Sequence, residues 1–430
     1  MARLASKSRR LYRRAIRAIP GGVNSPVRYY PPYPMFVAEA RGSRFRTVEG
    51  EEYLDYCMAY GALIDGHASG EVVEAVQNAA EKGSIYGQPT EVEVELAETI
   101  SSQVRSMQMV RLVNSGTEAT MHALRLARGF TGKKKILKFE GGFHGSHDSV
   151  LVKPGRPGSI TGRPSSEGIP LETSENTLVA PYNDEKTAAK IIRDYASQLA
   201  AVIVEPVAGN MGPVPPATGF LESLSRLTRE NRVVLIFDEV ITGFRLSLGG
   251  AQEYYHIIPD LTILGKIVGG GFPLAAFGGR REIMRKLSPL GPVYQAGTFS
   301  GNPVSVTAGL TTLRSLKRRS NRIYPRLERL GAFLSNGIRD HLESLKVSAQ
   351  TNQVGSMFQT FFTSRKVTDY NSAKSSDVDR YNRYFRSLLA SNVFVPPSQL
   401  ESCFLSTAHE EAEIEQTLDA IGESLRSLRG

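Results

Sequence analysis

The sequence predicts an α/β protein, with a mostly parallel central sheet in a large domain and a smaller α+β domain built from the N- and C-terminal segments. Short continuous apolar runs alternate with segments of helical periodicity through the middle of the chain, which is typical of parallel strands buried on both faces. Polar residues directly follow several of these runs, as expected where a ligand binds beyond the carboxyl ends of strands. The chain has 430 residues, 41% of them hydrophobic, which is enough for one large core and a smaller one.

The middle of the chain supplies the strands of the large domain. MVRLVN (109–114) precedes a helical segment with alanine and leucine on its apolar side from Ala119 to Ala127. Three further runs are apolar almost throughout and indicate buried strands: KKILKF (134–139), LAAVIVEP (199–206) and VVLIFDEV (233–240). From about residue 316, helical segments and a few strand-like runs indicate a second domain. We therefore expect an N-terminal segment at 1–63, a large domain at 64–315 and a small domain at 316–430.

One segment, Lys153–Pro170 (KPGRPGSITGRPSSEGIP), interrupts this alternation. It is rich in glycine, proline and serine and has no periodicity. A long irregular segment inside a compact domain is usually functional or disordered. We expect a lid that closes over the active site.

The N-terminus is strongly basic in a chain whose net charge is +9. No acidic residue precedes Glu39, and the first turns carry Arg3, Lys7, Arg9, Arg10, Arg13, Arg14 and Arg17. Transit peptides and nucleic-acid-binding arms have such compositions. The residues Leu11, Ala15, Ile16 and Ile19 fall on one helical face, however, which favours a docked amphipathic helix with its basic face in water.

Other features exclude two classes of protein. No apolar run reaches the roughly 18 to 20 residues that a membrane-spanning helix needs, and no apolar core of a secretory signal is present. The two cysteines, Cys57 and Cys403, cannot form a disulfide framework. A reducing, cytoplasmic location is therefore expected.

The stretch LTILGKIVGGGFPLAA (261–276) contains one charged residue, Lys266. An ammonium group among apolar residues loses hydration, which favours the neutral, nucleophilic amine. The alternative is a long side chain that reaches water from a half-buried strand end.

Two more polar features follow predicted strands. Asn114-Ser115-Gly116-Thr117 lies at a strand-to-helix junction, where backbone N–H groups and the helix dipole suit a phosphate; an ordinary helix cap is the alternative. Asp238 ends the most apolar strand, and a buried carboxylate usually pairs with a cation. A P-loop is excluded because neither Ser nor Thr follows Lys266.

These features together match the requirements of pyridoxal phosphate. The cofactor needs a phosphate anchor, an acidic partner for its protonated ring nitrogen and an amine for covalent attachment. Phe143 in FHG offers an aromatic surface for the ring. The histidines His144 and His147 have no third ligand in the pattern, so no metal is predicted.

Six motifs extend this match to a known family. They are GGVNSPVR (21–28), NSGTEATMHALRLAR (114–128), VEPVAGNMGPVPP (204–216), FDEVITGFR (237–245), LGKIVGGGFP (264–273) and YQAGTFSGNP (294–303). From about Leu11 to Leu425 the chain resembles the class III aminotransferase family of fold-type I pyridoxal phosphate enzymes. GGVNSPVR and VEPVAGNMG are more specific and resemble its aminomutase branch.

The resemblance implies an activity and a cofactor. The expected cofactor is pyridoxal 5′-phosphate or pyridoxamine 5′-phosphate. The expected reaction moves an amino group within glutamate 1-semialdehyde to give 5-aminolevulinate for tetrapyrrole synthesis. The resemblance also implies a homodimer and glutamyl-tRNA reductase as a further partner, with no direct binding of nucleic acid or membrane.

Residue roles follow from the same resemblance. Lys266 carries the covalent link and moves protons, while Asp238 keeps the ring nitrogen protonated. Phosphate contacts come from Ser115, Gly116 and Thr117, and from Gly297 and Thr298 of a neighbouring subunit. The other expected cofactor contacts are Phe143, His144, Glu205 and Asn210. The expected substrate contacts are Ser25, Arg28, Tyr60 and Glu401.

Two positions depart from the aminomutase pattern. Phe143 stands where a tyrosine is usual, and Tyr60 stands where a tryptophan is usual; both keep an aromatic surface. The nearest alternative function is an ordinary class III aminotransferase with an external amino donor. A basic RNA-binding protein is the alternative from another class, but it leaves Lys266 and Asp238 unexplained.

Overall fold

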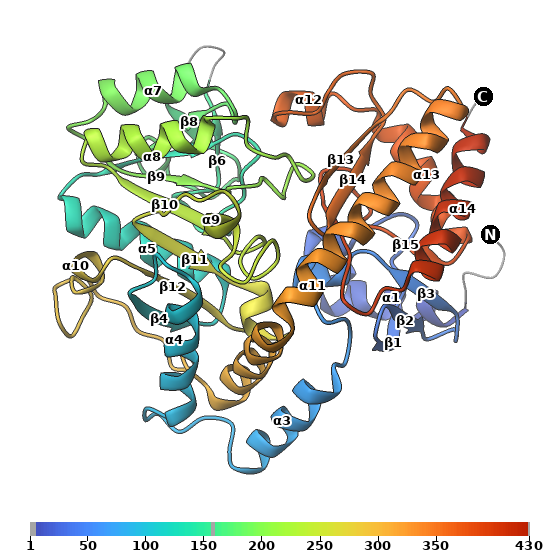
Figure 1. The fold of residues 1–430 in the computed structure, drawn as a ribbon, viewed down its shortest axis with the longest axis horizontal. Coiled ribbons are helices and arrows are strands. Elements are labelled where there is room, and N and C mark those ends of the chain that lie inside the picture. The colour runs from blue at the N-terminus through green and yellow to red at the C-terminus, as the bar shows by residue number, and fades with distance from the viewer. Residues whose placement is uncertain (1–5, 156–159, 429–430) are drawn as a thin grey trace. The chain divides into compact units, whose positions relative to one another are not determined.

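The computed structural model describes residues 6–155 and 160–428. It divides into two compact units (Figure 1), each described by itself. Unit 1 comprises Met1–Ser69, Pro325–Val367 and Ser372–Gly430, and unit 2 comprises Gly70–Tyr324 and Thr368–Asn371. One helix, α11 (Pro303–Ser344), runs through the boundary expected at 315/316. The division at residues 63 and 315 stays a prediction.

A seven-stranded sheet forms the centre of unit 2. Its strands lie in the order β4 (Met109–Val113), β12 (Ala275–Gly279), β11 (Leu261–Leu264), β10 (Val234–Glu239), β9 (Leu199–Val204), β5 (Lys135–Phe139) and β8 (Thr177–Ala180). Only β12 is antiparallel to its neighbours; the pairs from β11 to β8 are all parallel. The predicted mostly parallel sheet is thus confirmed, and the four predicted runs are β4, β5, β9 and β10.

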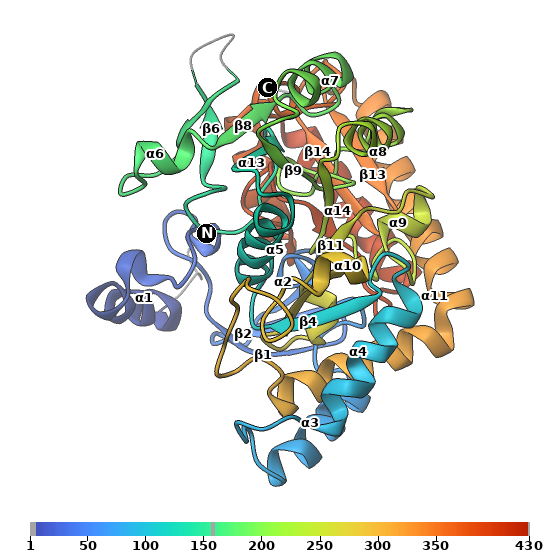
Figure 2. The same ribbon diagram turned by 90° about the vertical axis from the view of Figure 1, so that its left-hand side faces the viewer.

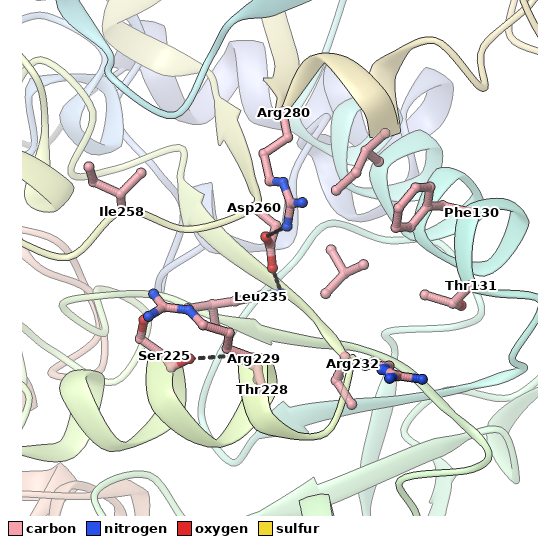
Figure 3. A pocket seen from close by; sticks show the side chains of 13 residues that line it. Phe130, Thr131, Ser225, Thr228, Arg229, Arg232, Leu235, Ile258, Asp260 and Arg280 are labelled. Carbon is pink, nitrogen blue, oxygen red and sulfur yellow. Dashed lines mark hydrogen bonds and ion pairs between the residues drawn. The ribbon is translucent and has the colours of Figure 1, made fainter.

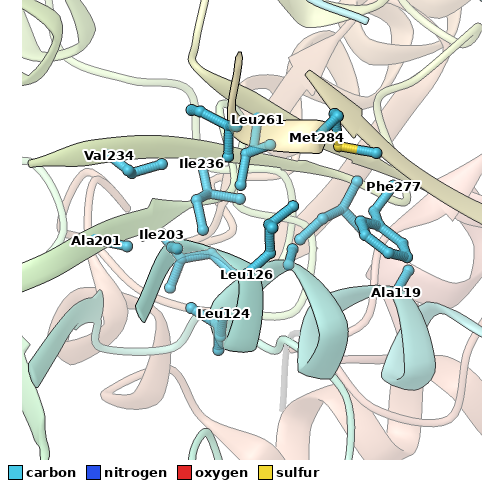
Figure 4. Close-up of a cluster of buried hydrophobic side chains, with 14 of the residues drawn as sticks. Ala119, Leu124, Leu126, Ala201, Ile203, Val234, Ile236, Leu261, Phe277 and Met284 are labelled. Carbon is cyan, nitrogen blue, oxygen red and sulfur yellow. The ribbon is translucent and has the colours of Figure 1, made fainter. Parts of the chain in front are cut away.

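Helices cover both faces of this sheet. The helix α5 (Gly116–Thr131) packs its apolar side on one face, where Ala119 and Leu126 join Ile203, Ile236 and other strand residues in one buried cluster (Figure 4). The opposite face carries α7 (Glu185–Asp194) and α8 (Phe220–Glu230) (Figure 1). Each fully buried Leu or Ile contributes about 1.5–3 kcal/mol, so this core fixes where the strand ends lie.

Smaller elements complete unit 2. They are α3 (Gly70–Glu81), α4 (Glu91–Gln103), β6 (Val152–Pro154), β7 (Gly162–Pro164), α6 (Leu171–Ser174), α9 (Ala251–Tyr254), the 3₁₀ helix η3 (Lys266–Gly269) and α10 (Arg281–Met284). The short α12 (Tyr370–Lys374) has residues in both units.

The segment predicted as a lid is partly regular. Its strands β6 and β7 pair in antiparallel register, with Lys153 opposite Arg163, and β6 lies beside β8 (Figure 2). Residues 156–159 of this segment lie outside the described residues. The lid stays a prediction.

Unit 1 contains two small sheets and several helices. One sheet has the order β1 (Val37–Arg41), β2 (Arg44–Thr47), β3 (Glu52–Asp55) and β15 (Val393–Phe394), and the other has the order β13 (Gln350–Val354), β14 (Met357–Phe361) and β16 (Cys403–Phe404). The helices are α1 (Ser6–Ala18), η1 (Pro20–Gly22), η2 (Pro26–Arg28), α2 (Met58–Gly61), α13 (Val378–Ala390), α14 (Glu411–Ser427) and the end of α11. This agrees with the predicted α+β character.

The predicted N-terminal helix is confirmed as α1. Its buried Ser8 hydroxyl donates to Glu49 Oε2 at 2.8 Å, and Tyr12 stacks on Tyr33. The five arginines from Arg9 to Arg17 are exposed. The helix is thus docked, but Ile16, one of the four residues on the expected apolar face, is 50% exposed.

Three further observations concern the described residues alone. No helix among them is both long and apolar enough to cross a membrane. No group of three His, Cys, Asp or Glu side chains among them could hold a metal ion. Cys57 and Cys403 are buried free thiols.

Candidate active site

The predicted cofactor residues of unit 2 converge at the carboxyl ends of β4, β10 and β11. Val240 follows β10 and donates its backbone N–H to Asp238 Oδ1 at 3.1 Å. A Cβ atom at Gly116 would lie 3.2 Å from the Val240 side chain, and one at Gly265 would lie 3.1 Å from it. Since glycine lets two backbones approach closely, these two glycines bring the start of α5 and Lys266 to the same strand end as Asp238.

Asp238 is a buried carboxylate near the end of β10. It is 4% exposed, and its Oδ2 lies 2.7 Å from His144 Nδ1. Burial lowers the pKa of His144, while the hydrogen bond to Asp238 and the charge of Asp238 act in the opposite direction. Such a carboxylate calls for a cation, and a protonated pyridine nitrogen is one.

Glu205 follows β9 and holds two other predicted residues. Its Oε1 accepts the N–H of Phe143 at 2.7 Å, and its Oε2 accepts the Asn210 amide at 3.1 Å and the N–H of Gly209 at 2.8 Å. Burial, and next the charge of Asp238, raise the pKa of Glu205 to about 7, although these donors act in the opposite direction. Phe143, anchored in this way, keeps its side chain 51% exposed as an aromatic surface.

The raised pKa of Glu205 predicts a pH dependence of stability. In the apoprotein the folded state binds this proton more tightly than the unfolded state, whose glutamate has the ordinary value of 4.5. The stabilising contribution is complete below pH 4.5 and is lost as the pH rises through about 7, a change of about 3 kcal/mol.

Chemical denaturation from pH 4.5 to 8 measures this effect by comparing wild-type apoprotein with Glu205→Gln. The amide of the variant changes the free energy of unfolding by an amount that does not depend on pH. The result is therefore the difference between the two proteins in the slope of this free energy against pH. We expect the wild-type stability to fall relative to the variant over this range. Parallel curves of unfolding free energy against pH would contradict the raised pKa of Glu205.

Lys266 is the first residue of η3, directly after β11 and Gly265. Its backbone is left-handed, with φ of 49°, and the residue is partly exposed. The side chain is thus less enclosed than its apolar neighbours in the sequence suggest. Left-handed backbone at a non-glycine residue is costly and clusters at functional sites.

The start of α5 has the geometry of an anion site. Ser115 caps the helix, and its Oγ accepts the N–H of Glu118 at 3.2 Å. The first N–H groups of an α-helix have no acceptor within the helix, which leaves those of Gly116 and Thr117 for a phosphate. Thr117 Oγ1 accepts the N–H of Ser146, and a Cβ at Gly145 would lie 2.7 Å from Thr117. Helix cap and anion site are therefore compatible here.

Gly297 and Thr298 lie in an exposed loop of unit 2. A Cβ at Gly297 would lie 3.8 Å from the Asn114 side-chain amide of the same chain. The nearby Arg111 donates to Gln295 at 2.6 Å and holds the start of this loop. Their contact with a neighbouring subunit stays a prediction.

The expected substrate residues lie in unit 1. Ser25 precedes η2, and its carbonyl accepts the N–H of Arg28 at 3.1 Å. Arg28 and Tyr60 line one cavity of about 440 Å³. Glu401 does not line this cavity, but its charge acts on Tyr60 together with those of Arg28 and other residues. The structure thus brings Arg28 and Tyr60 to one cavity, which Glu401 does not line.

A second cavity, of about 590 Å³, lies at the opposite end of the central sheet (Figure 3). Its walls include Leu235 near the start of β10 and Asp260 just before β11. Asp260 accepts the N–H of Leu235 at 2.9 Å and forms an ion pair with Arg280 at 2.7 Å. The charge of its carboxylate is therefore compensated within the protein. None of the predicted site residues lines this cavity.

Several residues around these sites escaped the sequence analysis. Val240 and Gly145 shape the cofactor site by close packing. The position of Gly145 directly after Phe143-His144 is the only sequence signal for this packing. Lys138 is buried and donates to Val150 O at 3.0 Å, and burial lowers its pKa to about 8. Asp55 and His67 form a pair at 2.8 Å, for which the sequence offers no signal.

The residues of unit 2 fit pyridoxal phosphate in chemistry and placement. The helix start suits the phosphate, Phe143 offers an aromatic face, Asp238 is a buried carboxylate suited to a protonated ring nitrogen, and Lys266 follows the adjacent strand. Each of these groups lies at or beside the same strand ends, where ligands of α/β sheets bind.

Comparisons with known proteins agree with this site. Residues 26–399 match the family model of class-III aminotransferases. Glutamate-1-semialdehyde 2,1-aminomutase of Methanothermobacter thermautotrophicus is 54% identical over 98% of this chain and 100% of its own length. An omega-transaminase from Sphaerobacter thermophilus superposes with a TM-score of 0.94 at 37% identity, covering 100% of this chain and 99% of its own. A transaminase with pyridoxal phosphate bound gives a TM-score of 0.91 at 31% identity, covering 99% and 98%.

Proposed function

The chain belongs to the class-III aminotransferase family, and on this premise we propose that it is a pyridoxal phosphate-dependent aminomutase that converts glutamate 1-semialdehyde to 5-aminolevulinate. The observation that supports this most is the 54% identity with a glutamate-1-semialdehyde 2,1-aminomutase over the whole length of that enzyme. The cofactor residues at the ends of β4, β10 and β11 supply the chemistry that such an enzyme needs. The product feeds tetrapyrrole synthesis.

Each residue of the site has a proposed task in this reaction. Bound pyridoxal phosphate supplies an electron sink and a carrier for the amino group. Lys266 Nζ attaches the cofactor and moves a proton at the substrate carbon, and Asp238 holds the proton on the ring nitrogen. The N–H groups of Gly116 and Thr117 bind the phosphate, with Ser115 beside them. Phe143 would offer its aromatic face to the ring, while His144, Glu205 and Asn210 would line the cofactor.

The substrate carboxylate is assigned to Arg28. A guanidinium matches a carboxylate in charge and geometry, and Arg28 is exposed into the cavity that Tyr60 also lines. Ser25 and Glu401 complete the proposed substrate contacts. An aminomutase must retain its substrate while the amino group moves between two carbons, so a firm carboxylate anchor is central to the proposal.

Wild-type enzyme given glutamate 1-semialdehyde and no other amine should form 5-aminolevulinate over many turnovers. The readout is product per cofactor equivalent. An aminotransferase with an external donor would instead stop after about one equivalent and resume when an amino donor is added, which would replace the aminomutase proposal.

Arg28→Ala should lower kcat/KM for glutamate 1-semialdehyde roughly ten- to a hundredfold. A charge-assisted hydrogen bond contributes about 1.5–3 kcal/mol, and its loss falls on the substrate alone. The absorption spectrum of the bound cofactor should stay unchanged. Arg41→Ala, at an exposed arginine at the end of β1 in the same unit, is the matched control; an equal loss there would contradict the role of Arg28.

The homodimer is part of the same proposal. The loop with Gly297 and Thr298 is flanked by exposed aromatic side chains, Tyr294 at 70% and Phe299 at 60%, which is unusual for a surface facing water. A partner copy covering this loop would bring both residues to its phosphate. Sedimentation of wild-type protein should give twice the chain mass of 47.1 kDa.

Two further expectations accompany this proposal. Glutamyl-tRNA reductase is the proposed supplier of the aldehyde substrate, and co-sedimentation of the two purified enzymes tests their association. A cytoplasmic location is proposed because Cys57 and Cys403 are free thiols, as in a reducing compartment.

A further inference from the structure

Three consecutive non-glycine residues adopt left-handed backbone in the turn that carries Tyr60. The φ angles are 45° at Met58, 52° at Ala59 and 56° at Tyr60, and Gly61 follows at 89°. L-residues avoid this region because Cβ crowds the following carbonyl. Such a conformation persists only where the surroundings impose it, and it is concentrated at functional sites.

The carboxylate of Asp55 binds the start of this turn from the end of β3. Its Oδ1 accepts the N–H of Cys57 at 2.7 Å and that of Met58 at 3.1 Å. Its Oδ2 lies 2.8 Å from His67 Nε2. The backbone of His67 exchanges two hydrogen bonds with Gly42, at 2.8 and 2.9 Å, so the imidazole extends from a fixed position.

Close packing supports the far end of the turn. A Cβ at Gly61 would lie 2.8 Å from the ring of Phe404. The Phe404 N–H donates to Tyr56 O at 2.7 Å, and Met58 is fully buried. The turn is therefore held by Asp55 on one side and by Phe404 on the other.

The turn directs the Tyr60 hydroxyl to the segment that carries Arg28. This hydroxyl donates to Val27 O at 2.6 Å. Burial raises the pKa of Tyr60, Cys57 and Glu401 act in the same direction, and Arg28 opposes them, so the hydroxyl is a neutral donor. Arg28, Asp55, Tyr60 and His67 all line the cavity of about 440 Å³.

We propose that Asp55 and His67 are positioning residues for the substrate: they hold the left-handed turn Met58–Gly61, through which the Tyr60 hydroxyl fixes Val27 and hence the Arg28 guanidinium. The inference rests on the proposed function, because it takes Arg28 as the anchor of the substrate carboxylate. Neither Asp55 nor His67 touches substrate in this scheme. The effect on the reaction passes through the Tyr60 hydroxyl.

Steady-state kinetics of four variants test this chain of contacts. Tyr60→Phe and His67→Ala should each raise KM for glutamate 1-semialdehyde roughly three- to tenfold, the loss expected for one neutral hydrogen bond. The value of kcat and the cofactor spectrum should change less than twofold. In the double variant His67→Ala/Tyr60→Phe, KM should equal that of Tyr60→Phe alone, because both changes remove the same contact.

The fourth variant is a rescue. Glycine adopts left-handed backbone without steric cost, so Ala59→Gly should restore a nearly wild-type KM to His67→Ala. Tyr53→Phe is the matched control, because it removes a hydroxyl that contacts Glu51 at 3.2 Å in the same sheet without touching the turn. Its KM should stay at the wild-type value.

The outcomes separate this inference from the proposed function. Wild-type enzyme that forms no 5-aminolevulinate rejects the function. Wild-type turnover with multiplied KM effects in the double variant, or with no rescue by Ala59→Gly, overturns the positioning role alone. A parallel loss of kcat and of the cofactor spectrum in His67→Ala would also overturn it, since that pattern indicates a general structural defect.

Discussion

Lys266→Ala should abolish the borohydride-reducible absorbance of the holoenzyme and lower the rate by at least ~10²–10⁴-fold. This range is the effect expected from loss of an acid–base group alone. It is a minimum because the variant also loses the covalent attachment of the cofactor. Alanine retains a Cβ at the left-handed φ of 49°, so the backbone cost is the same in both proteins. The comparison therefore isolates the amine.

The measurement combines the spectrum with product formation from glutamate 1-semialdehyde. Lys286→Ala, at an exposed lysine just after α10, is the control and should keep both the absorbance and the rate. Retention of both in Lys266→Ala would show that another amine carries the chemistry. Burial alone does not make Lys138 that amine, because its Nζ already donates to Val150 O and Val152 O.

Asp238→Asn should have the second largest effect, a loss of about 10²–10³-fold in kcat, the range found for removal of one electrostatic contact to a reacting group. The amide retains the size of the side chain but cannot neutralise a protonated ring nitrogen. Loss of the charge should also lower the pKa of Glu205, because Asp238 raises it in the wild-type protein. Cofactor affinity should fall together with the rate.

The neighbouring carboxylate offers a matched control. Glu239 is fully buried but accepts hydrogen bonds from Gln252 and Thr242, away from His144. Glu239→Gln should therefore lower the melting temperature while kcat stays within a factor of two. An equal loss of kcat in both variants would show that the effect of Asp238→Asn comes from disturbed packing around β10.

The central sheet was predictable because its strands are buried on both faces. Parallel strands of this kind appear in the sequence as unbroken apolar runs, and β5, β9 and β10 were located within two residues. The reversed direction of β12 was not predictable, because an apolar run contains no information on strand direction. The domain boundary expected at 315/316 falls inside α11, which continues without a break from Pro303 to Ser344.

The candidate site was predictable where a residue lies at the end of a strand or directly after one. Asp238 and Lys266 stand out because a charge ends an apolar run, and Ser115 because it starts a helix. The pair of Asp55 and His67 acts instead on the turn Met58–Gly61, which the sequence does not indicate. Three of its four left-handed positions, Met58, Ala59 and Tyr60, are neither glycine nor asparagine, so ordinary turn signals are missing at these three residues.

The discontinuity of unit 1 has a consequence for the order of folding during translation. Strand β3, which leads into the Tyr60 turn, pairs with β15, and Ser43 bonds to Glu413, 370 positions further along the chain. Domains generally fold as units while the chain emerges from the ribosome. Unit 2, nearly continuous in sequence, can therefore fold first, whereas the N-terminal segment waits for the last strands. Nascent chains released before Phe404 should thus contain the cofactor-binding sheet without a formed substrate cavity.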